Sequence, residues 1–246
     1  MKFIVKGEEP SRLRKWREAQ KSTPQNLRYI NIPTDALKHL RDALIEEQGC
    51  LCAYTMMRIS KMRGGHAGRA RPAYEPRFEH NGHIEHIGAQ HSNAELQVSY
   101  RNMVYCHPGE AAARCAFGAH AKDGEDVSPE NFVSPLNETC ETRFAFTKDG
   151  KVAAADPDDI AAERTIYILN LNCSELAKAR TRAITLLAMF QKGRRAFSAG
   201  QAEKLLESFH VKDRQGRYPE FVIALTQVTE KYVKQKAAKE AAMAGR

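Results

Sequence analysis

The segment His83–Ile87 (HIEHI) places a carboxylate beside an imidazole, between alternating isoleucines. Such alternation is typical of a short β-strand, in which the neighbouring Glu85 and His86 side chains point in different directions. Hydrolysis of a phosphodiester uses a divalent cation to neutralise charge on the phosphate and a neutral imidazole to take a proton from water. A carboxylate suits a hard cation, and histidine suits the base because its pKa lies near working pH. We therefore expect Glu85 to bind metal and His86 to act as the general base.

Three downstream side chains are candidates to complete this site. Asn102 lies sixteen residues after His86, and His120 with Lys122 begins eighteen residues after Asn102. We expect the Asn102 amide to hold the imidazole of His86 in one tautomer, and His120 to complete the metal site. Mg²⁺ or Mn²⁺ is the natural single cation for such a set of oxygen and nitrogen ligands.

The order Glu-His, then Asn, then His resembles the ββα-metal (HNH) nucleases. More closely, the chain is similar to the HNH nuclease subunit (PtuB-like) of the Septu and retron-associated anti-phage systems. The resemblance runs from the N-terminal segment ending near Trp16 through at least Arg180. The segments that carry it are CAYT at Cys52, HIEHI at His83, RNMVYC at Arg101, GAHAKDG at Gly118 and TIYILNLNCSELAKAR at Thr165.

This resemblance implies an HNH endonuclease, a hydrolase that cuts phosphodiester bonds as an effector of antiviral defence. The implied partners are nucleic acid, either DNA or tRNA, and an SMC/ABC-type ATPase subunit (PtuA-like), with a retron reverse transcriptase and its ncRNA/msDNA as a further candidate. The implied site residues are the metal ligands Glu85 and His120, the base His86, the orienting amide Asn102, and Lys122 and His83 beside the scissile phosphate.

The cysteines leave a structural zinc open. Thiols of a cytoplasmic protein stay reduced, so the six cysteines are better interpreted as metal ligands or small buried residues than as disulfides. The related proteins often have Cys-Ala-Tyr-Cys where this chain has Cys-Ala-Tyr-Thr at 52–55, and structural zinc needs four ligands. The single residue between the first two candidates is an awkward spacing for one tetrahedral ion. The candidate ligands are Cys50, Cys52, Cys106 and Cys115, with His107 as a substitute.

A second class of function follows from that zinc. The chain would then be a non-catalytic, zinc-supported module that binds nucleic acid or a partner, with Glu85 and His86 bracing the fold. Its distinguishing prediction is a thiolate-bound zinc and binding that survives His86→Ala. For the nuclease, we instead expect His86→Ala to remove cleavage and leave the melting temperature nearly unchanged, whereas Leu44→Ala should cost about 2 to 5 kcal/mol.

Charge favours a polyanionic partner. The chain has 246 residues, a net charge of +8 and a pI near 9.2. Over residues 58–77, ahead of HIEHI, six cations face only Glu75, in what is either a phosphate-binding segment or a solvated loop: Arg58, Lys61, Arg63, Arg69, Arg71 and Arg77.

No apolar run approaches the roughly 18 residues that cross a bilayer, and the first residues turn charged before a signal peptide develops, so we expect a cytoplasmic protein without a membrane partner.

The elements that must position these residues are helical at both ends of the chain. Residues 32–49 predict a helix closed by Gly49, and residues 64–82 a long loop. Ser92 and Glu95 have the spacing of a capping box for a short helix, and residues 102 to about 135 are irregular. Further on, the pattern predicts a hairpin with its turn at 149–150. A helix capped by Ser174 should follow, continue to Phe190 and end before Gly193. Two more helices are predicted over 198–210 and 218–239.

We therefore expect an α+β fold, mostly helical, with a small ββα-metal (HNH) insert framed by N-terminal and C-terminal helices. The predicted organisation is a basic segment and helix over 1–49, the HNH ββα-metal nuclease core over 50–135, and a hairpin with a C-terminal helical region over 136–246. We expect the C-terminal helices to form the surface that docks onto the partner.

Overall fold

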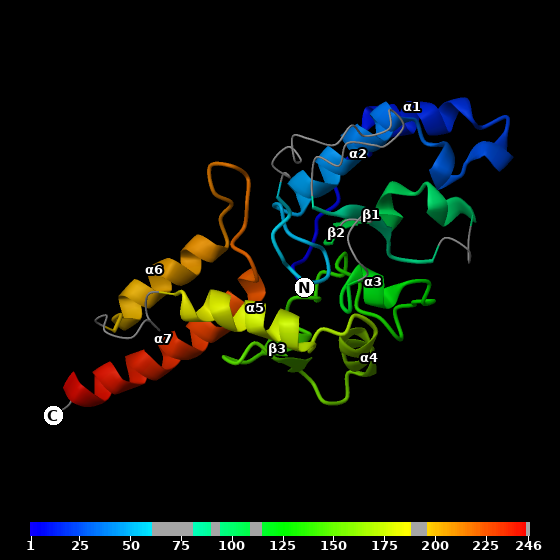
Figure 1. Cartoon of the computed structure of the whole chain (residues 1–246). Helices are drawn as coiled ribbons and strands as arrows, with labels where there is room; N and C mark the ends of the chain where they lie inside the picture. The colour runs from blue at the N-terminus through cyan, green and yellow to red at the C-terminus, as the bar shows by residue number, and fades with distance from the viewer. Residues whose placement is uncertain (61–80, 90–93, 109–114, 188–195, 245–246) are drawn as a thin grey trace, which may run out of the picture.

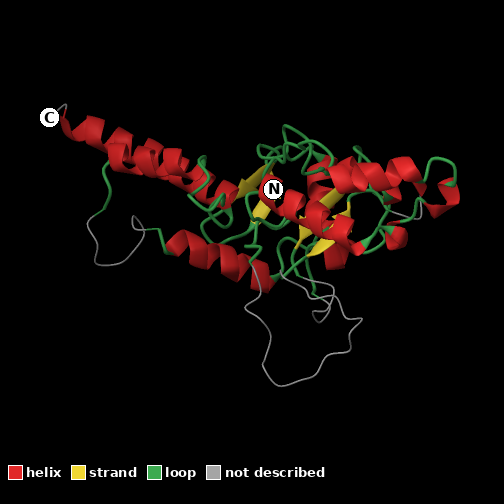
Figure 2. Ribbon diagram, turned by 90° about the horizontal axis from the view of Figure 1, so that it is seen from above, coloured by secondary structure: helices red, strands yellow, loops and turns green. Residues whose placement is uncertain are grey.

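The computed structural model describes residues 1–60, 81–89, 94–108, 115–187 and 196–244. Over these ranges the fold is mostly helical α+β, as predicted, with two separate two-stranded antiparallel sheets (Figures 1 and 2). None of the helices in these ranges is long and apolar enough to cross a membrane. The helices are α1 (Ser11–Ala19), α2 (Thr34–Glu47), α3 (Ala119–Lys122), α4 (Ile160–Ile168), α5 (Ser174–Thr185), α6 (Ala199–Phe209) and α7 (Val222–Ala244).

Helix α2 confirms the first predicted helix. It buries Leu40 and Leu44 completely in the main hydrophobic core. Gly49 follows it with a φ of +57°, the left-handed conformation that glycine adopts without a steric penalty. A Cβ atom on Gly49 would lie only 2.3 Å from the ring of Tyr218, so both the backbone conformation and the packing require glycine here.

The first sheet joins β1 (His83–His86) to β2 (Met103–Cys106) in antiparallel register, with Glu85 opposite Val104. Strand β2 is buried along its whole length. Its outer edge is closed by Gln48, whose side chain accepts from the Tyr105 N–H at 2.7 Å and donates to the Tyr105 carbonyl at 2.8 Å. The end of α2 therefore fixes the position of the sheet that carries the candidate catalytic pair.

The second sheet is the predicted hairpin, formed by β3 (Phe144–Phe146) and β4 (Val152–Ala154). Gly150 in its turn has a φ of +75°. On the outer edge of β3, the Gln227 side chain from α7 accepts from the Phe146 N–H at 2.9 Å and donates to the Phe144 carbonyl at 2.7 Å. The long C-terminal helix is thereby attached to the hairpin (Figure 1).

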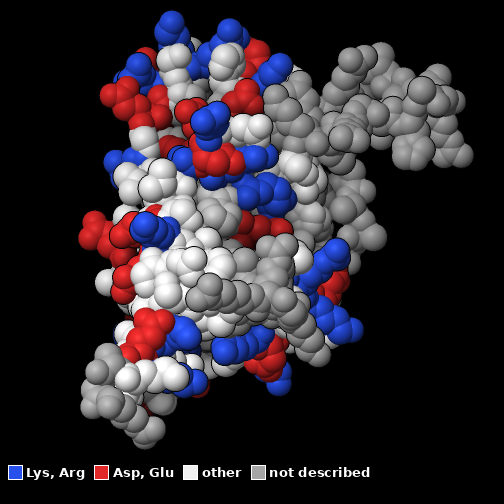
Figure 3. All heavy atoms as spheres, turned by 90° about the vertical axis from the view of Figure 1, so that its left-hand side faces the viewer, with Lys and Arg blue, Asp and Glu red and all other residues white. Residues whose placement is uncertain are grey.

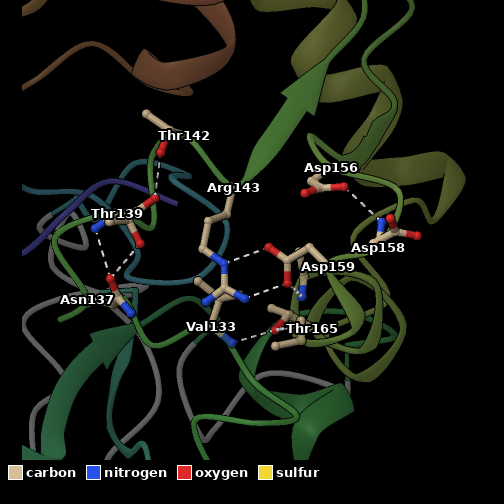
Figure 4. A network of polar contacts seen from close by, with 11 residues as sticks. Val133, Asn137, Thr139, Thr142, Arg143, Asp156, Asp158, Asp159 and Thr165 are labelled. Carbon is tan, nitrogen blue, oxygen red and sulfur yellow. Dashed lines mark hydrogen bonds and ion pairs between the residues drawn. The ribbon is translucent and has the colours of Figure 1, made fainter.

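Helix α4 is anchored at its first turn. The Asp159 side chain caps the helix by accepting from the Ala162 N–H at 2.9 Å. Figure 4 shows the Arg143 guanidinium reaching the same carboxylate, with Nε 2.7 Å from one oxygen. The Asp159 carboxylate therefore both caps α4 and accepts a charged hydrogen bond from Arg143. These two contacts connect α4 to the start of β3.

The C-terminal helices follow the predicted order with different boundaries. Helix α6 starts where predicted, and Ser198 caps it in a complete capping box with Gln201. Ser174, however, is the first residue of α5 and not its cap, because Cys173 occupies the N-cap position without a side-chain hydrogen bond. Helix α5 ends at Thr185, so its predicted continuation is not helical over 186–187, where the chain turns. The rest of that continuation over 188–190, the cap at Gly193 and Ser92 lie outside the described residues.

Helix α7 begins at Val222, four residues later than predicted. The segment before it is attached to the N-terminal half, because Tyr218 donates to the Gly49 carbonyl and Phe221 donates to the Met56 carbonyl, both at 3.0 Å. Phe221 also has a φ of +56°, which is incompatible with a right-handed helix. Tertiary hydrogen bonds therefore delay the start of the helix.

Candidate active site

Four of the candidate residues meet where α3 lies against β1. Lys122 Nζ is 2.9 Å from Glu85 Oε1, and His83 Nε2 is 3.7 Å from Glu85 Oε2. The rings of His83 and His120 stack, with their centroids 5.4 Å apart. The one-turn helix α3 thus faces the side of β1 from which His83 and Glu85 project.

The hydrogen bond of His83 determines where its lone pair lies. Its Nδ1 contacts the Pro108 carbonyl, which can only accept, so Nδ1 carries the hydrogen of the neutral ring. In the neutral ring, Nε2 carries the lone pair and faces Glu85 Oε2, which is also an acceptor, whereas a protonated ring would form an ion pair with this carboxylate. Two electron-donating atoms at this separation fit a shared cation, as oxygen and nitrogen ligands of divalent metals do.

His120 has the opposite arrangement. Its Nδ1 accepts from the Cys115 backbone N–H at 3.0 Å, so Nε2 carries the hydrogen of the neutral ring. A nitrogen that bears hydrogen has no lone pair for a metal. In this tautomer neither ring nitrogen of His120 offers a lone pair to a cation, so its assignment as the second metal ligand stays a prediction, whereas His83, expected beside the phosphate, lies next to Glu85.

His86 lies on the other face of β1 and is only 5% exposed. Its Nε2 is 2.9 Å from the Gln97 carbonyl, and its ring meets Tyr29 edge-on at 4.9 Å between centroids. Burial lowers the pKa of His86 below its usual value, although the hydrogen bond to Gln97 acts in the opposite direction. The imidazole is therefore neutral near pH 7, with its hydrogen on Nε2 and its lone pair on Nδ1, as a general base requires.

Asn102 supports the base indirectly. Its amide accepts from the Gly88 N–H at 2.8 Å and donates to the carbonyls of Gly88 and Leu96, both at 3.0 Å. These bonds hold the chain that follows β1 against the chain that ends in Gln97. Within the described ranges, the Asn102 amide makes no hydrogen bond to the His86 imidazole. The Gln97 carbonyl instead orients this ring, which is the role that was predicted for Asn102. Sequence reasoning missed Gln97 because a backbone carbonyl leaves no residue-type signal.

Lys122 is turned inward. Its side chain is 1% exposed, and Nζ also donates to the His86 carbonyl at 3.0 Å. In this conformation the ammonium compensates the Glu85 charge and caps the open edge of β1. The expected role of Lys122 beside the scissile phosphate stays a prediction.

The candidate zinc ligands do not assemble. Cys52 and Cys106 are buried neighbours, and burial together with their mutual hydrogen bond raises the pKa of Cys106. Cys50 lies near Arg58 instead, and Cys115 lies near Cys173 and Glu175. His107, the proposed substitute, has its Nδ1 2.9 Å from the Asn81 carbonyl. Across the parts of the chain that are described, no three His, Cys, Asp or Glu side chains form a metal-binding group, so the four-cysteine site is not formed.

The predicted basic segment is described only at its first residue. The Arg58 guanidinium donates to three carbonyls, those of Gly49, Cys50 and Tyr218, and therefore holds the fold together rather than facing a phosphate. The other five cations of this segment lie outside the described residues. On the face that Figure 3 displays, Lys and Arg side chains are interspersed with Asp and Glu.

Neither a protein-family model nor a curated protein matches this chain.

Proposed function

We propose that the chain is a metal-dependent HNH-type endonuclease whose ββα-metal unit consists of β1, β2 and α3. One juxtaposition supports this most directly. Glu85 and His83 present two facing acceptor atoms 3.7 Å apart, and the residue next to Glu85 is a buried, neutral histidine with an oriented ring. Hydrolysis of a phosphodiester needs one group of side chains that binds the metal and another that takes a proton from water, and these neighbouring residues can supply both.

In this proposal, His86 takes the proton from the attacking water through Nδ1. The Gln97 carbonyl holds the tautomer, and Asn102 holds the segment that contains that carbonyl. Glu85 and His86 project from opposite faces of β1. A phosphate that both side chains act on must therefore lie across the C-terminal end of the strand, where it can be reached from either face. Asn102 is therefore a positioning residue.

Glu85 and His83 are the residues that would hold the cation, since a carboxylate oxygen and an imidazole nitrogen suit Mg²⁺ or Mn²⁺. Bound there, the cation would neutralise charge on the phosphate and on the leaving oxygen. Lys122 balances the charge of Glu85 from the other oxygen of the carboxylate.

The proposed substrate is the backbone of a nucleic acid, DNA or tRNA, which the net charge of +8 favours. From the resemblance we also propose an antiviral defence role with an SMC/ABC-type ATPase partner. That partner would restrain or deliver the nuclease, because a small nuclease that cuts freely threatens its own cell. A retron reverse transcriptase with its ncRNA/msDNA is a further partner that we propose on the same resemblance.

The decisive experiment is cleavage of plasmid DNA and total tRNA with Mg²⁺ or Mn²⁺, with and without the ATPase. The informative variant is His86→Gln, because glutamine keeps a donor for the Gln97 carbonyl but has no basic nitrogen. His39→Ala, an exposed histidine on α2, is the matched control. We expect wild type and His39→Ala to cut and His86→Gln to be inactive. The proposal fails if no polymer is cut with the ATPase present, or if His86→Gln cuts as well as wild type.

The burial of His86 and Lys122 favours a second candidate, a non-catalytic module that binds nucleic acid or a partner. Both side chains hold β1 to its neighbours and so have a structural use without any reaction. In that case, wild type and His86→Gln bind the same nucleic acid with equal affinity, and neither cuts it with any divalent cation.

A further inference from the structure

Carboxamide side chains close the outer sheet edges in this fold. Gln48 closes β2, and Gln227 closes β3. On β4, Asn172 accepts from the Val152 N–H at 2.9 Å and donates to the Val152 carbonyl at 2.8 Å. Each amide stands in for one residue of a neighbouring strand, which satisfies edge groups that would otherwise pair with another chain.

Ala154 is the exception on β4. The register pairs Phe146 with Val152 and Phe144 with Ala154, so the N–H and C=O of Val152 and Ala154 point to the same, outer side. Asn172 satisfies Val152 alone. Among the described residues, no group hydrogen-bonds to the N–H or the C=O of Ala154. The outer edge of β4 therefore offers one donor and one acceptor beside a built-in strand mimic.

This edge lies in a groove of about 860 Å³. Strand β4 forms one wall, and one face of α4 forms the other through Glu163, Ile166 and Tyr167, at helical spacings of three and four. Tyr167 is 75% exposed and Ile166 is partly buried, so this wall presents apolar surface to the groove. The groove thus combines an open strand edge with an apolar wall.

The charge of the groove is opposite to that of the chain. Its lining includes the carboxylates Glu125 and Glu163 and no Lys or Arg, although the chain as a whole carries +8. Arg164, outside the lining, lies 5.6 Å from the centroid of the Tyr167 ring and approaches Glu125 at 3.6 Å, where both side chains are about half exposed and the pair is weak. The groove is therefore suited to a positively charged occupant.

We propose that this groove binds an extended, basic segment of a partner protein, which adds a strand to the outer edge of β4 beyond Asn172. The backbone of the segment would pair with Ala154, its apolar side chains would cover Ile166 and Tyr167, and a basic side chain would approach Glu163. Main-chain pairing supplies affinity in this mode of recognition, and the alternating side chains supply selectivity. Ala121 of α3 also lines the groove, so the segment would lie against the helix that carries Lys122.

The test uses the full chain and short fluorescent peptides in which valine alternates with lysine or with glutamate, read by anisotropy. We expect the lysine peptide to bind and the glutamate peptide not to bind. Glu163→Lys should weaken binding by roughly tenfold, because it puts like charges together. Glu203→Lys, an exposed charge reversal on α6, is the matched control and should have no effect.

Two further measurements identify the strand. Ala154→Pro removes the outward donor, which an edge strand tolerates, and should weaken binding while the circular dichroism spectrum stays unchanged. In the wild type, hydrogen exchange at the Ala154 amide should slow when the lysine peptide is bound. The proposal is overturned if the two peptides bind equally, if Glu163→Lys and Glu203→Lys act alike, or if saturating peptide leaves the Ala154 exchange rate unchanged. None of these readouts depends on nuclease activity.

Discussion

Lys122 and Glu85 form a partly buried ion pair that joins helix α3 to strand β1. The two side chains are 1% and 15% exposed, and Nζ lies 2.9 Å from Oε1. The same ammonium donates to the His86 carbonyl, so one cation contacts two consecutive residues of the candidate site. Because α3 has only four residues, it depends on tertiary contacts such as this one to hold its position.

Replacing the ammonium tests the strength of that contact. We expect Lys122→Met to lower the free energy of unfolding by about 1 to 3 kcal/mol, because the partly buried Glu85 carboxylate and the His86 carbonyl both lose their hydrogen-bond donor. Urea denaturation measures the loss, with the exposed Lys151→Met as control. The double variant Lys122→Met with Glu85→Gln should recover part of it. If Lys122→Met and Lys151→Met unfold at the same urea concentration, the ion pair is not stabilising.

His86 contributes to stability as well as to the candidate site. From the sequence, His86→Ala was expected to leave the melting temperature nearly unchanged. His86→Ala removes a buried ring and its hydrogen bond to Gln97, so we expect a loss of about 1 to 3 kcal/mol. His86→Gln should lose less, because its amide can donate to the same carbonyl. Thermal unfolding compares the two variants, and equal melting temperatures would show that the hydrogen bond contributes nothing.

Leu44 remains a core position, as predicted. It is fully buried on α2 within the main cluster, and we expect Leu44→Ala to cost about 2 to 5 kcal/mol through lost contacts and the cavity left behind. Leu37→Ala, on the same helix but only partly buried, is the matched control and should cost less. Chemical denaturation of the two variants under identical conditions measures the difference.

Asp159 should make stability depend on pH at the acid end. The hydrogen bond from Arg143 holds the pKa of Asp159 below its usual value, so the unfolded state binds this proton more readily than the folded state. Its stabilising contribution is present above the pKa of an unfolded aspartate, near 4, and is lost as pH falls through the lower folded value. Asp159→Asn keeps an oxygen for the Ala162 N–H but lacks the charge.

The measurement is the difference in unfolding free energy between wild type and Asp159→Asn over this range. We expect the difference to be constant from about pH 5 upward and to shrink as the pH falls below about 4. Subtracting the variant removes the contributions of the other carboxylates. A difference that does not change across the range would mean that Arg143 does not bias the protonation of Asp159.

Local patterns in the sequence were sufficient for the elements whose cause is local. The leucine spacing of α2, the glycine that closes it, the hairpin turn at Gly150 and the start of α6 at Ser198 all depend on interactions within a few residues. For the same reason, HIEHI was correctly read as a strand with Glu85 and His86 on different faces. The late start of α7 was missed because its cause, Phe221 bound to Met56, lies far away in the chain.

The chemistry of the candidate site depended on tertiary structure. Residue types alone indicated that histidines, a carboxylate and an amide were present in a suggestive order, but not which ring nitrogen carries the lone pair. That is decided by the backbone groups that meet each ring: the Pro108 carbonyl at His83, the Gln97 carbonyl at His86 and the Cys115 N–H at His120. Every residue has such groups, so they leave no trace in sequence composition or spacing, and only the folded chain selects among them.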